Sequence, residues 1–335
     1  MSKIVYLIGA GASADALPLV KGDHLDGRDG LPEALVTTGS ELVKGNTIPE
    51  NQEYVEKLKD QFEDLAKKSI EFDTIDTYAK YCYLRNPDEL QKIKKLLLIY
   101  FTYEQGLKKF FDKRYLVFLT TILIDNDRLP DNIKILSWNY DSQFQIASEQ
   151  FVKERYYMDP KERILKTKSL LNYFPSFITT RLPTLDSYST YSLLHLNGIA
   201  GYENGDSNII KDYYRKETRT TDEFIKFAKT SLERYPSLIR FAWEREINPE
   251  KVITLDIAKA MVANTTVLVV IGYSFPFFNR EIDREIINTI RKPILEKVYY
   301  QNLIPGDFLA SQFDIDKKII ENVDRVNQFF VPPEF

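Results

Sequence analysis

Short, uninterrupted runs of apolar residues recur along the chain and alternate with longer segments of helical character. Runs of this kind, bounded by turn residues, are typical of strands that are buried on both faces. They lie at residues 3–8, 134–138, 192–196 and 266–271, with a weaker example at 297–301. Buried strands separated by long helical segments predict an α/β fold, with a Rossmann-like parallel sheet and helices on both faces.

The segments between the strands contain most of the predicted helices. Apolar residues recur at three- and four-residue spacing in residues 55–66 and 75–82, which places them on one face of a helix. Two more helices are expected at about 88–112 and 114–125. Residues 17–50 show no clean period and are rich in Gly, Asp, Thr and Pro, so we expect an extended loop there.

The organisation into domains follows from how these segments are joined. No low-complexity linker marks a boundary in the sequence, and no internal repeat divides it. We therefore expect a single domain over residues 1–335 that carries large helical insertions. These insertions are expected at about 51–128, 151–187 and 203–250.

Composition narrows the class of protein. The 335 residues include 45 Lys plus Arg and 49 Asp plus Glu, a formal charge of −4, so nothing favours binding to nucleic acid or an anionic membrane. No apolar run approaches the roughly 20 residues of a membrane helix. The single cysteine, Cys82, excludes an intrachain disulfide and a four-cysteine zinc ribbon. With only His24 and His195 as histidines, we expect no metal site and a cytoplasmic protein.

A glycine-rich turn follows the first predicted strand. Glycines at a strand-to-helix turn let backbone N–H groups approach a phosphate, and the helix behind them adds partial positive charge. The turn therefore predicts a diphosphate site, although a tight turn without a ligand is the alternative. Its residues are Gly9, Ala10, Gly11, Ala12 and Ser13.

The sequence after this turn disfavours a nicotinamide-dependent dehydrogenase. Such an enzyme has a second strand that ends in an acidic residue about 20 positions further on. Asp26 and Asp29 lie near that distance, but they stand among glycines and no apolar run precedes them. This segment resembles a loop that folds over a ligand rather than a ribose-binding strand end.

Two later strands end in polar residues. In a parallel sheet, ligands bind beyond the carboxyl ends of the strands. Asn139 and Asp141 follow one strand, and their two-residue spacing directs both to the same side if the backbone stays extended. His195 and Asn197 share a face of the next strand before Gly198 ends it. Helix capping and a structural histidine are the alternatives to a functional role.

The strand over 266–271 ends in Gly272, Tyr273 and Ser274 and is followed by an amphipathic helix. Asn279 is the expected N-cap of that helix. Gly272, Ser274 and Asn279 are the candidate nucleotide contacts at this strand end. A Gly-Tyr-Ser turn that merely packs under the helix is the alternative.

Four short motifs carry a family resemblance. GAGAS, SWNYD, HLNG and IGYSFP occur in this order between residues 9 and 279, and the ordered set resembles the sirtuin-like family. That resemblance implies a nucleotide-binding sheet with an inserted helical module, and cleavage of the bond between nicotinamide and ribose. Because no four-cysteine zinc module can form, the chain is more similar to bacterial sirtuin-like anti-phage effectors, which hydrolyse NAD, than to protein deacylases.

The resemblance implies NAD as the substrate and assigns roles to residues. Asn139 would orient the ribose hydroxyls and an attacking water, Asp141 would support the ribose, and the glycine turn would hold the diphosphate. One position departs from the family: Asn197 stands directly before Gly198, where the family has its catalytic histidine. His195 lies two residues earlier, about 6.6–6.8 Å away along a strand, and is the candidate replacement.

The resemblance also implies partners. Such effectors form homo-oligomers or act with a separate protein that senses infection, and a nucleotide-sensing protein is one candidate. The departure at Asn197 keeps a second function open. In that alternative the chain is a weakly active or inactive subunit that binds NAD or ADP-ribose and regulates a partner through assembly.

Overall fold

The computed structural model divides the chain into two compact units. The first, the sheet unit, comprises Met1–Ser13, Asp112–Gly198 and Ala242–Phe335. The second, the helical unit, comprises Ala14–Phe111 and Ile199–Phe241. The structure describes residues 2–21, 30–109, 111–123, 128–155, 166, 169–175, 184–204, 207–208, 219–241, 243–244 and 249–335.

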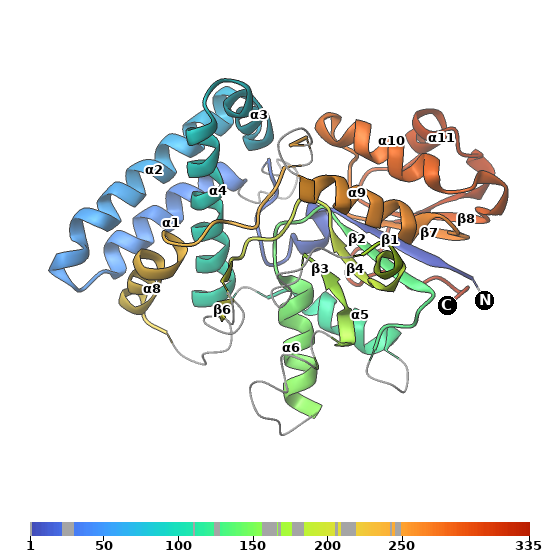
Figure 1. The fold of residues 1–335 in the computed structure, drawn as a ribbon, viewed down its shortest axis with the longest axis horizontal. Coiled ribbons are helices and arrows are strands. Elements are labelled where there is room, and N and C mark those ends of the chain that lie inside the picture. The colour runs from blue at the N-terminus through green and yellow to red at the C-terminus, as the bar shows by residue number, and fades with distance from the viewer. Residues whose placement is uncertain are drawn as a thin grey trace. The chain divides into compact units, whose positions relative to one another are not determined.

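A parallel sheet of seven strands forms the centre of the sheet unit in the part of the chain described (Figure 1). The strands are β1 (Ile4–Ile8), β2 (Ile133–Ser137), β3 (Tyr173–Phe174), β4 (Leu193–His195), β7 (Val267–Ile271), β8 (Lys297–Gln301) and β9 (Ile320–Val323). Their order is β3-β4-β2-β1-β7-β8-β9, and every neighbouring pair is parallel. Without the two-residue β3, this is the third-second-first-fourth-fifth-sixth order of dinucleotide-binding folds.

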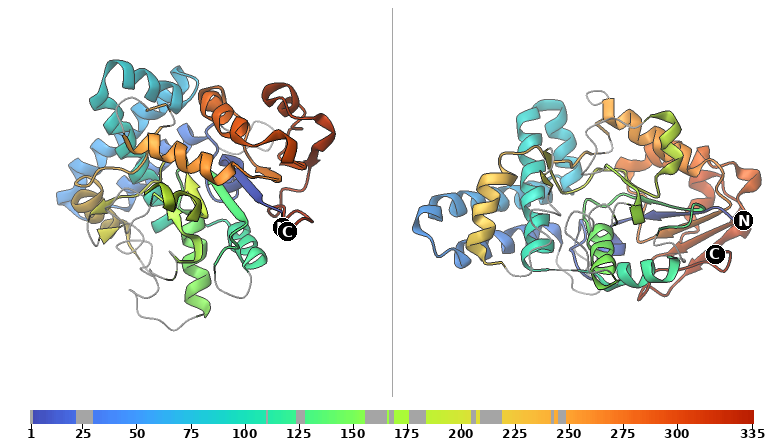
Figure 2. Two further views of the ribbon diagram at one scale, coloured as in Figure 1. Left: turned by 45° about the vertical axis from the view of Figure 1, so that its right-hand side comes forward. Right: turned by 60° about the horizontal axis from the view of Figure 1, so that its bottom comes forward.

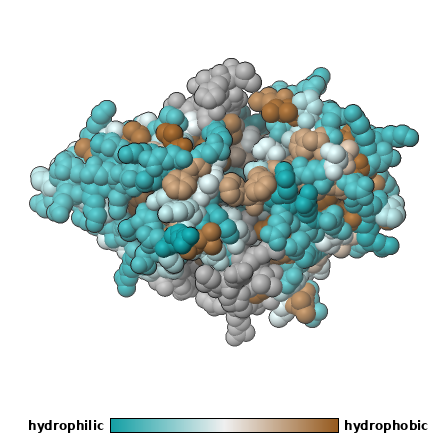
Figure 3. All heavy atoms as spheres, turned by 90° about the horizontal axis from the view of Figure 1, so that it is seen from above, coloured by the Kyte–Doolittle hydropathy of each residue, from teal (hydrophilic) through white to brown (hydrophobic). Residues whose placement is uncertain are grey.

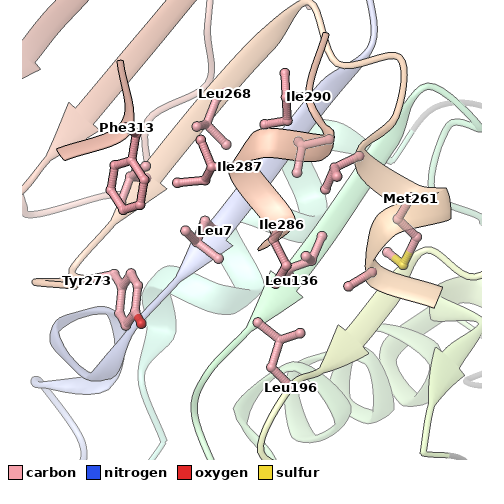
Figure 4. Close-up of a cluster of buried hydrophobic side chains, with 14 of the residues drawn as sticks. Leu7, Leu136, Leu196, Met261, Leu268, Tyr273, Ile286, Ile287, Ile290 and Phe313 are labelled. Atoms are coloured by element: carbon pink, nitrogen blue, oxygen red, sulfur yellow. The ribbon is translucent and has the colours of Figure 1, made fainter. Parts of the chain in front are cut away.

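Helices cover both faces of this sheet, as the sequence predicts (Figures 1 and 2). On one face, α9 (Pro249–Val262), α10 (Arg280–Thr289) and α11 (Phe308–Phe313) pack onto a hydrophobic core. In Figure 4, Leu7 of β1 and Leu136 of β2 point toward Ile286 of α10.

The opposite face of the sheet is covered by α5 (Lys113–Ile122) and α6 (Gln143–Arg155). Tyr6 of β1 packs there against Phe118 at 4.9 Å between ring centroids. Alternate residues of β1 therefore reach opposite cores, which explains its continuous apolar sequence.

The helical unit contains α1 (Leu31–Gly45), α2 (Gln52–Glu71), α3 (Ile75–Arg85), α4 (Pro87–Thr102) and α8 (Thr221–Phe227). It also holds the short strands β5 (Glu203–Asn204) and β6 (Ser207–Asn208), and two π-helical turns at Tyr103–Leu107 and Ala228–Leu232. The predicted faces of α2 and α3 are buried, so those two helices are confirmed.

One prediction in this unit is wrong: residues 17–50 are not an extended loop, because α1 occupies Leu31–Gly45. Pro32 in the first turn suits a helix start. The buried face of α1 includes Thr38 and Gly39 between its leucines, and these residues obscure the apolar period. A β-carbon at Gly39 would lie 3.0 Å from the Lys59 Cα, so a side chain there would crowd α2.

The predicted insertions overlap only partly with these units. Residues 112–122, expected within the first insertion, lie in the sheet unit and include α5. Much of 151–187 and of 203–250 lies outside the described residues. The edge strands β3 and β9 were not predicted, since one has two residues and the other is not fully buried.

Among the described residues, no helix combines the length and apolar character needed to cross a membrane. Figure 3 shows one face of the molecule, where hydrophobic residues form small separate groups among hydrophilic ones. Isolated exposed apolar residues of this kind are normal on a protein surface.

Candidate functional site

The candidate site lies at the carboxyl ends of β1, β2, β4 and β7. β1 is central and pairs with β2 on one side and β7 on the other. In the sheet, β2 and then β4 lie on one side of β1, whereas β7 and then β8 lie on the other side. The direction in which successive strands are added therefore reverses between β1 and β7. Such a reversal is where open α/β sheets bind ligands.

The glycine turn after β1 packs tightly against the turn after β7. A β-carbon on Gly9 would lie 2.6 Å from the Gly272 carbonyl oxygen, and one on Gly11 would lie 2.9 Å from the Gly272 Cα. Gly272 itself has φ of +59°, a conformation that other residues adopt rarely. The contact between the two turns therefore requires these glycines whether or not a phosphate binds.

Several backbone N–H groups of the glycine turn already have partners. Gly9 donates to the Ile271 carbonyl at 3.0 Å, and Gly11 donates to the Gly272 carbonyl at 2.9 Å. The helix expected behind the turn is a four-residue 3-10 helix, Ala10–Ser13, so its dipole is weaker than that of a full α-helix. Diphosphate binding by Gly9 to Ser13 stays a prediction.

Ser13 is the centre of a buried hydrogen-bond network with Asn139, Asp141 and Tyr115, which we call the serine network. Its Oγ lies 2.7 Å from Asp141 Oδ2, 2.7 Å from the Tyr115 hydroxyl and 3.2 Å from Asn139 Nδ2. Asn139 Nδ2 also donates to the Gly9 carbonyl at 3.0 Å. Asn139 and Asp141 thus reach the same hydroxyl, as their spacing predicts, and the ends of β1 and β2 meet there.

Asp141 is a buried carboxylate with several donors. Ser13 donates to Oδ2, and the Gln143 backbone N–H donates to Oδ1 at 3.1 Å. Burial raises the pKa of Asp141 to about 6, and the hydrogen bonds from Ser13 and Gln143 oppose that rise. Nearby Asp112 pushes the pKa in the same direction as burial. Asp141 is therefore mostly ionised at pH 7.

His195, at the end of β4, is fully buried and bonded at both ring nitrogens. Nδ1 lies 3.2 Å from the Asn139 carbonyl oxygen, and Nε2 lies 2.9 Å from Gln145 Nε2. Because a carbonyl oxygen only accepts, Nδ1 carries the proton and Nε2 accepts from Gln145. Burial lowers the pKa of His195 to about 4, opposed by its bond to Asn139. The neutral ring supports the backbone of the Asn139 loop.

Asn197 lies in a turn beyond the strand. The Gly198 N–H donates to the His195 carbonyl at 3.2 Å, and Gly198 has φ of +72°. β4 therefore ends at His195, and the expected strand alternation does not extend to Asn197. Asn197 Nδ2 donates to the Trp138 carbonyl and to the Tyr140 hydroxyl, each at 3.4 Å, while its buried Oδ1 has no partner among the described residues.

The end of β7 contributes packing. Tyr273 stacks on Trp138 with ring centroids 5.8 Å apart, and its hydroxyl donates to Asp283 of α10 at 2.8 Å. Burial raises the pKa of Asp283 well above its usual value. The side chains of Tyr273 and Trp138 therefore tie the loops after β7 and β2 to each other and to α10.

The two remaining predicted contacts, Ser274 and Asn279, form none of the hydrogen bonds given above for the serine network. Ser274 is exposed. Asn279 precedes α10 at the expected N-cap position but makes no side-chain capping bond. Their role as nucleotide contacts stays a prediction.

Sequence reasoning missed Tyr115 and Arg114, at the start of α5. Arg114 donates to the Ala12 carbonyl at 3.0 Å and forms an ion pair with buried Asp112 at 2.6 Å. The only signal in the sequence is Asp112 as the N-cap of α5, where it accepts from the Arg114 backbone N–H. No periodicity indicates that this helix begins beneath the glycine turn.

Comparison of the sequence with models of known protein families and with curated proteins finds no match. The family resemblance therefore rests on the four short motifs alone. Chemically, this arrangement combines an ionised carboxylate, an oriented amide and a neutral imidazole in a buried setting. Charged groups interact more strongly in such surroundings than in water.

Proposed function

We propose that this protein is a sirtuin-like hydrolase that cleaves the nicotinamide–ribose bond of NAD and releases nicotinamide and ADP-ribose. The observation that carries the proposal is the shared network of Ser13, Asn139 and Asp141 at the edge where strand order reverses. A sheet with this strand order accommodates a dinucleotide at that edge.

The chemistry of the reaction suits an ionised aspartate. Departure of nicotinamide leaves positive charge on the ribose carbon, and a fixed negative charge nearby lowers the energy of that state. Asp141 supplies this charge, because Ser13 and the Gln143 backbone N–H donate to it and it is mostly ionised at pH 7. Burial strengthens the interaction.

Asn139 would orient the ribose hydroxyls and the attacking water. Its Nδ2 is held by the Gly9 carbonyl and by Ser13, which gives the amide oxygen a defined direction. Asn197 would accept a hydrogen bond from a ribose hydroxyl, since its buried Oδ1 has no partner among the described residues. We assign His195 a structural role: it positions the loop that carries Asn139. It does not accept a proton in the proposed reaction, because its acceptor nitrogen already binds Gln145.

A second function has its own supporting observation. If a proton acceptor other than Asp141 is essential, the engaged ring of His195 and the asparagine at position 197 leave the site without one. The protein would then be a subunit that binds NAD or ADP-ribose without turnover and regulates a partner through assembly. Saturable nucleotide binding without nicotinamide release distinguishes this function from hydrolysis.

The biological setting of the proposal rests on the motif resemblance. In that setting the protein depletes NAD in phage-infected bacteria, as a homo-oligomer or under the control of a separate sensor protein. Assays should therefore include the purified chain alone and with candidate partners. Nucleotide-sensing proteins are the first to test.

Release of nicotinamide from NAD by the purified protein tests the proposal directly. Asn139→Ala should reduce the rate by about 10²-fold or more, the usual cost of losing a residue that stabilises the transition state. Asn132→Ala is a matched control. Asn132 lies just before the amino-terminal end of β2, away from the carboxyl ends of the strands, and its side chain donates to the Ser2 carbonyl. Equal turnover in the two variants would refute the assignment of the site.

A further inference from the structure

Tyr115 of α5 places a hydroxyl group directly against the serine network. The side chain is buried, and its ring packs edge-on against Phe144 at 4.7 Å and Phe329 at 4.9 Å between centroids. These contacts fix the ring, so the hydroxyl has one position, 2.7 Å from Ser13 Oγ. The tyrosine reaches the network from the sheet face that α5 and α6 cover.

The direction of each hydrogen bond at Ser13 follows from the chemistry of its neighbours. Asn139 Nδ2 can only donate, so Ser13 Oγ accepts from it. Ionised Asp141 can only accept, so the single hydroxyl proton of Ser13 points to Asp141. Tyr115 must therefore donate to Ser13. Ser13 then donates one bond and accepts two, which uses its full capacity.

We propose that Tyr115 is a positioning residue for the proposed hydrolysis, acting through Ser13 to hold Asp141 and Asn139 in their working orientation. The inference rests on the proposed function only for its effect on turnover. Its structural part is a chain of two hydrogen bonds, in which the Tyr115 hydroxyl donates to Ser13 and the Ser13 hydroxyl donates to Asp141. Donation from tyrosine makes the serine hydroxyl a better donor to the carboxylate, since hydrogen bonds in a chain strengthen one another.

The residue beside Tyr115 supports the same assignment. Arg114 donates to the Ala12 carbonyl, while Tyr115 binds the side chain of Ser13, so two consecutive residues of α5 hold two consecutive residues of the turn. Arg114 is itself fixed by Asp112, and its guanidinium lies 5.6 Å from the Phe329 ring centroid. The start of α5 is therefore a rigid support for the end of β1.

The chain offers a matched control for the tyrosine hydroxyl. Tyr6 of β1 is also fully buried on this face of the sheet and packs against Phe118, but its hydroxyl has no hydrogen-bond partner among the described residues. Tyr115→Phe and Tyr6→Phe remove the same atom from the same aromatic core. Only the first removes a donor to Ser13.

The kinetic test compares these two variants. Tyr115→Phe should lower kcat by about 10-fold, the value of one buried hydrogen bond, while KM for NAD changes by less than about 3-fold. Tyr6→Phe should leave both constants near those of the wild type. In a Ser13→Ala background, Tyr115→Phe should add little further loss, because the tyrosine acts through the serine.

A second measurement is independent of turnover. Carbon-13 NMR titration of the aspartate carboxyl groups should show a higher pKa for Asp141 in Tyr115→Phe than in the wild type, because the hydrogen bond from Ser13 weakens. The titration should be unchanged in Tyr6→Phe. Asp112, close to Asp141 and paired with Arg114, is the other acidic group to follow in these spectra.

Two outcomes separate this inference from the proposed function. If the wild type binds NAD but never releases nicotinamide, the proposed function fails, and the NMR titration alone decides the role of Tyr115. The inference is overturned if the Asp141 titration is the same in Tyr115→Phe and Tyr6→Phe. It is also overturned if the effects of Tyr115→Phe and Ser13→Ala on kcat are independent.

Discussion

A buried titratable side chain lies at the end of β2 and another at the end of β4. Burial shifts their pKa values in opposite directions, one toward pH 7 and the other away from it. At the end of β2, burial raises the pKa of Asp141 to about 6. At the end of β4, burial lowers the pKa of His195 to about 4. Loss of water penalises the charged form in both cases. The pKa of an acid therefore rises toward 7, and the pKa of a base such as histidine falls further below 7.

This comparison changes which residue deserves the catalytic role. By residue type, histidine is the usual proton acceptor near pH 7. In this site both nitrogens of His195 have partners, whereas Asp141 keeps a charge near the proposed reaction centre. A buried carboxylate with good donors is thus a better candidate than a buried imidazole whose lone pair is already used.

The largest expected effect contrasts two substitutions of similar size at these strand ends. Asp141→Asn should lower the rate of nicotinamide release by about 10²–10³-fold, because it removes the charge that stabilises the ribose cation. His195→Asn should cost less than about 10-fold, because the asparagine amide can still donate to the Asn139 carbonyl. Steady-state kinetics with NAD measures both variants, and circular dichroism checks that each is folded.

A greater loss in His195→Asn than in Asp141→Asn would reverse the comparison. The histidine would then be the proton acceptor, and Gln145 would have to release its Nε2 during the reaction. Asp141 would in that case serve mainly to order the loop.

The next effect concerns stability. His195→Phe should lower the free energy of unfolding by about 2–3 kcal/mol, because it leaves the Asn139 carbonyl and the Gln145 amide without partners in a buried position. His195→Asn should retain part of this energy through its amide. Urea denaturation at pH 7 measures the wild type and both variants, and equal stability of the wild type and His195→Phe would show that the imidazole hydrogen bonds contribute nothing.

The smallest effect is a pair of opposite pH dependences between about pH 4 and pH 6.5. The folded pKa of His195 is below its unfolded value, so its contribution is complete above about pH 6.5 and is lost as pH falls toward 4. The folded pKa of Asp141 is above its unfolded value of about 3.8, so ionisation costs stability, and this cost disappears as pH falls from about 6 toward 4.

These signs can be read from differences in unfolding free energy between variants. The stability of the wild type relative to His195→Asn should fall by about 1–3 kcal/mol as the pH is lowered through this window. Relative to Asp141→Asn, it should rise by a similar amount. Slopes of the same sign would contradict the idea that burial dominates both sites.

Much of the sheet is predictable because burial on both faces leaves a local signal. β1, β2, β7 and β8 appear in the sequence as compact apolar runs within a residue or two of their observed ends. The edge strand β9 carries no such signal, because its exposed positions interrupt the run. α1 was missed for a related reason, since small and polar residues occupy part of its buried face.

The candidate site was predictable only in part. Ser13, Asn139 and Asp141 were recognised because they follow buried strands, and parallel strands bring their carboxyl ends to one edge. Tyr115 and Gln145 were missed, because they lie on helices where nothing local distinguishes them from other half-polar positions. The burial of His195 was also hidden, since a strand end can be exposed or covered with the same sequence.

The sequence by itself determined the α/β class, the buried strands and the polar residues at their ends, because hydrophobic period and turn chemistry act over a few neighbouring residues. Only the tertiary structure decided which of those polar groups meet. Tyr115 and Asp141 lie 102 and 128 residues after Ser13 in the chain, yet both form a hydrogen bond with its hydroxyl. Strand order and helix packing bring these groups together and exclude water from them. That loss of water raises the pKa of Asp141 toward 7 and lowers the pKa of His195 further below 7.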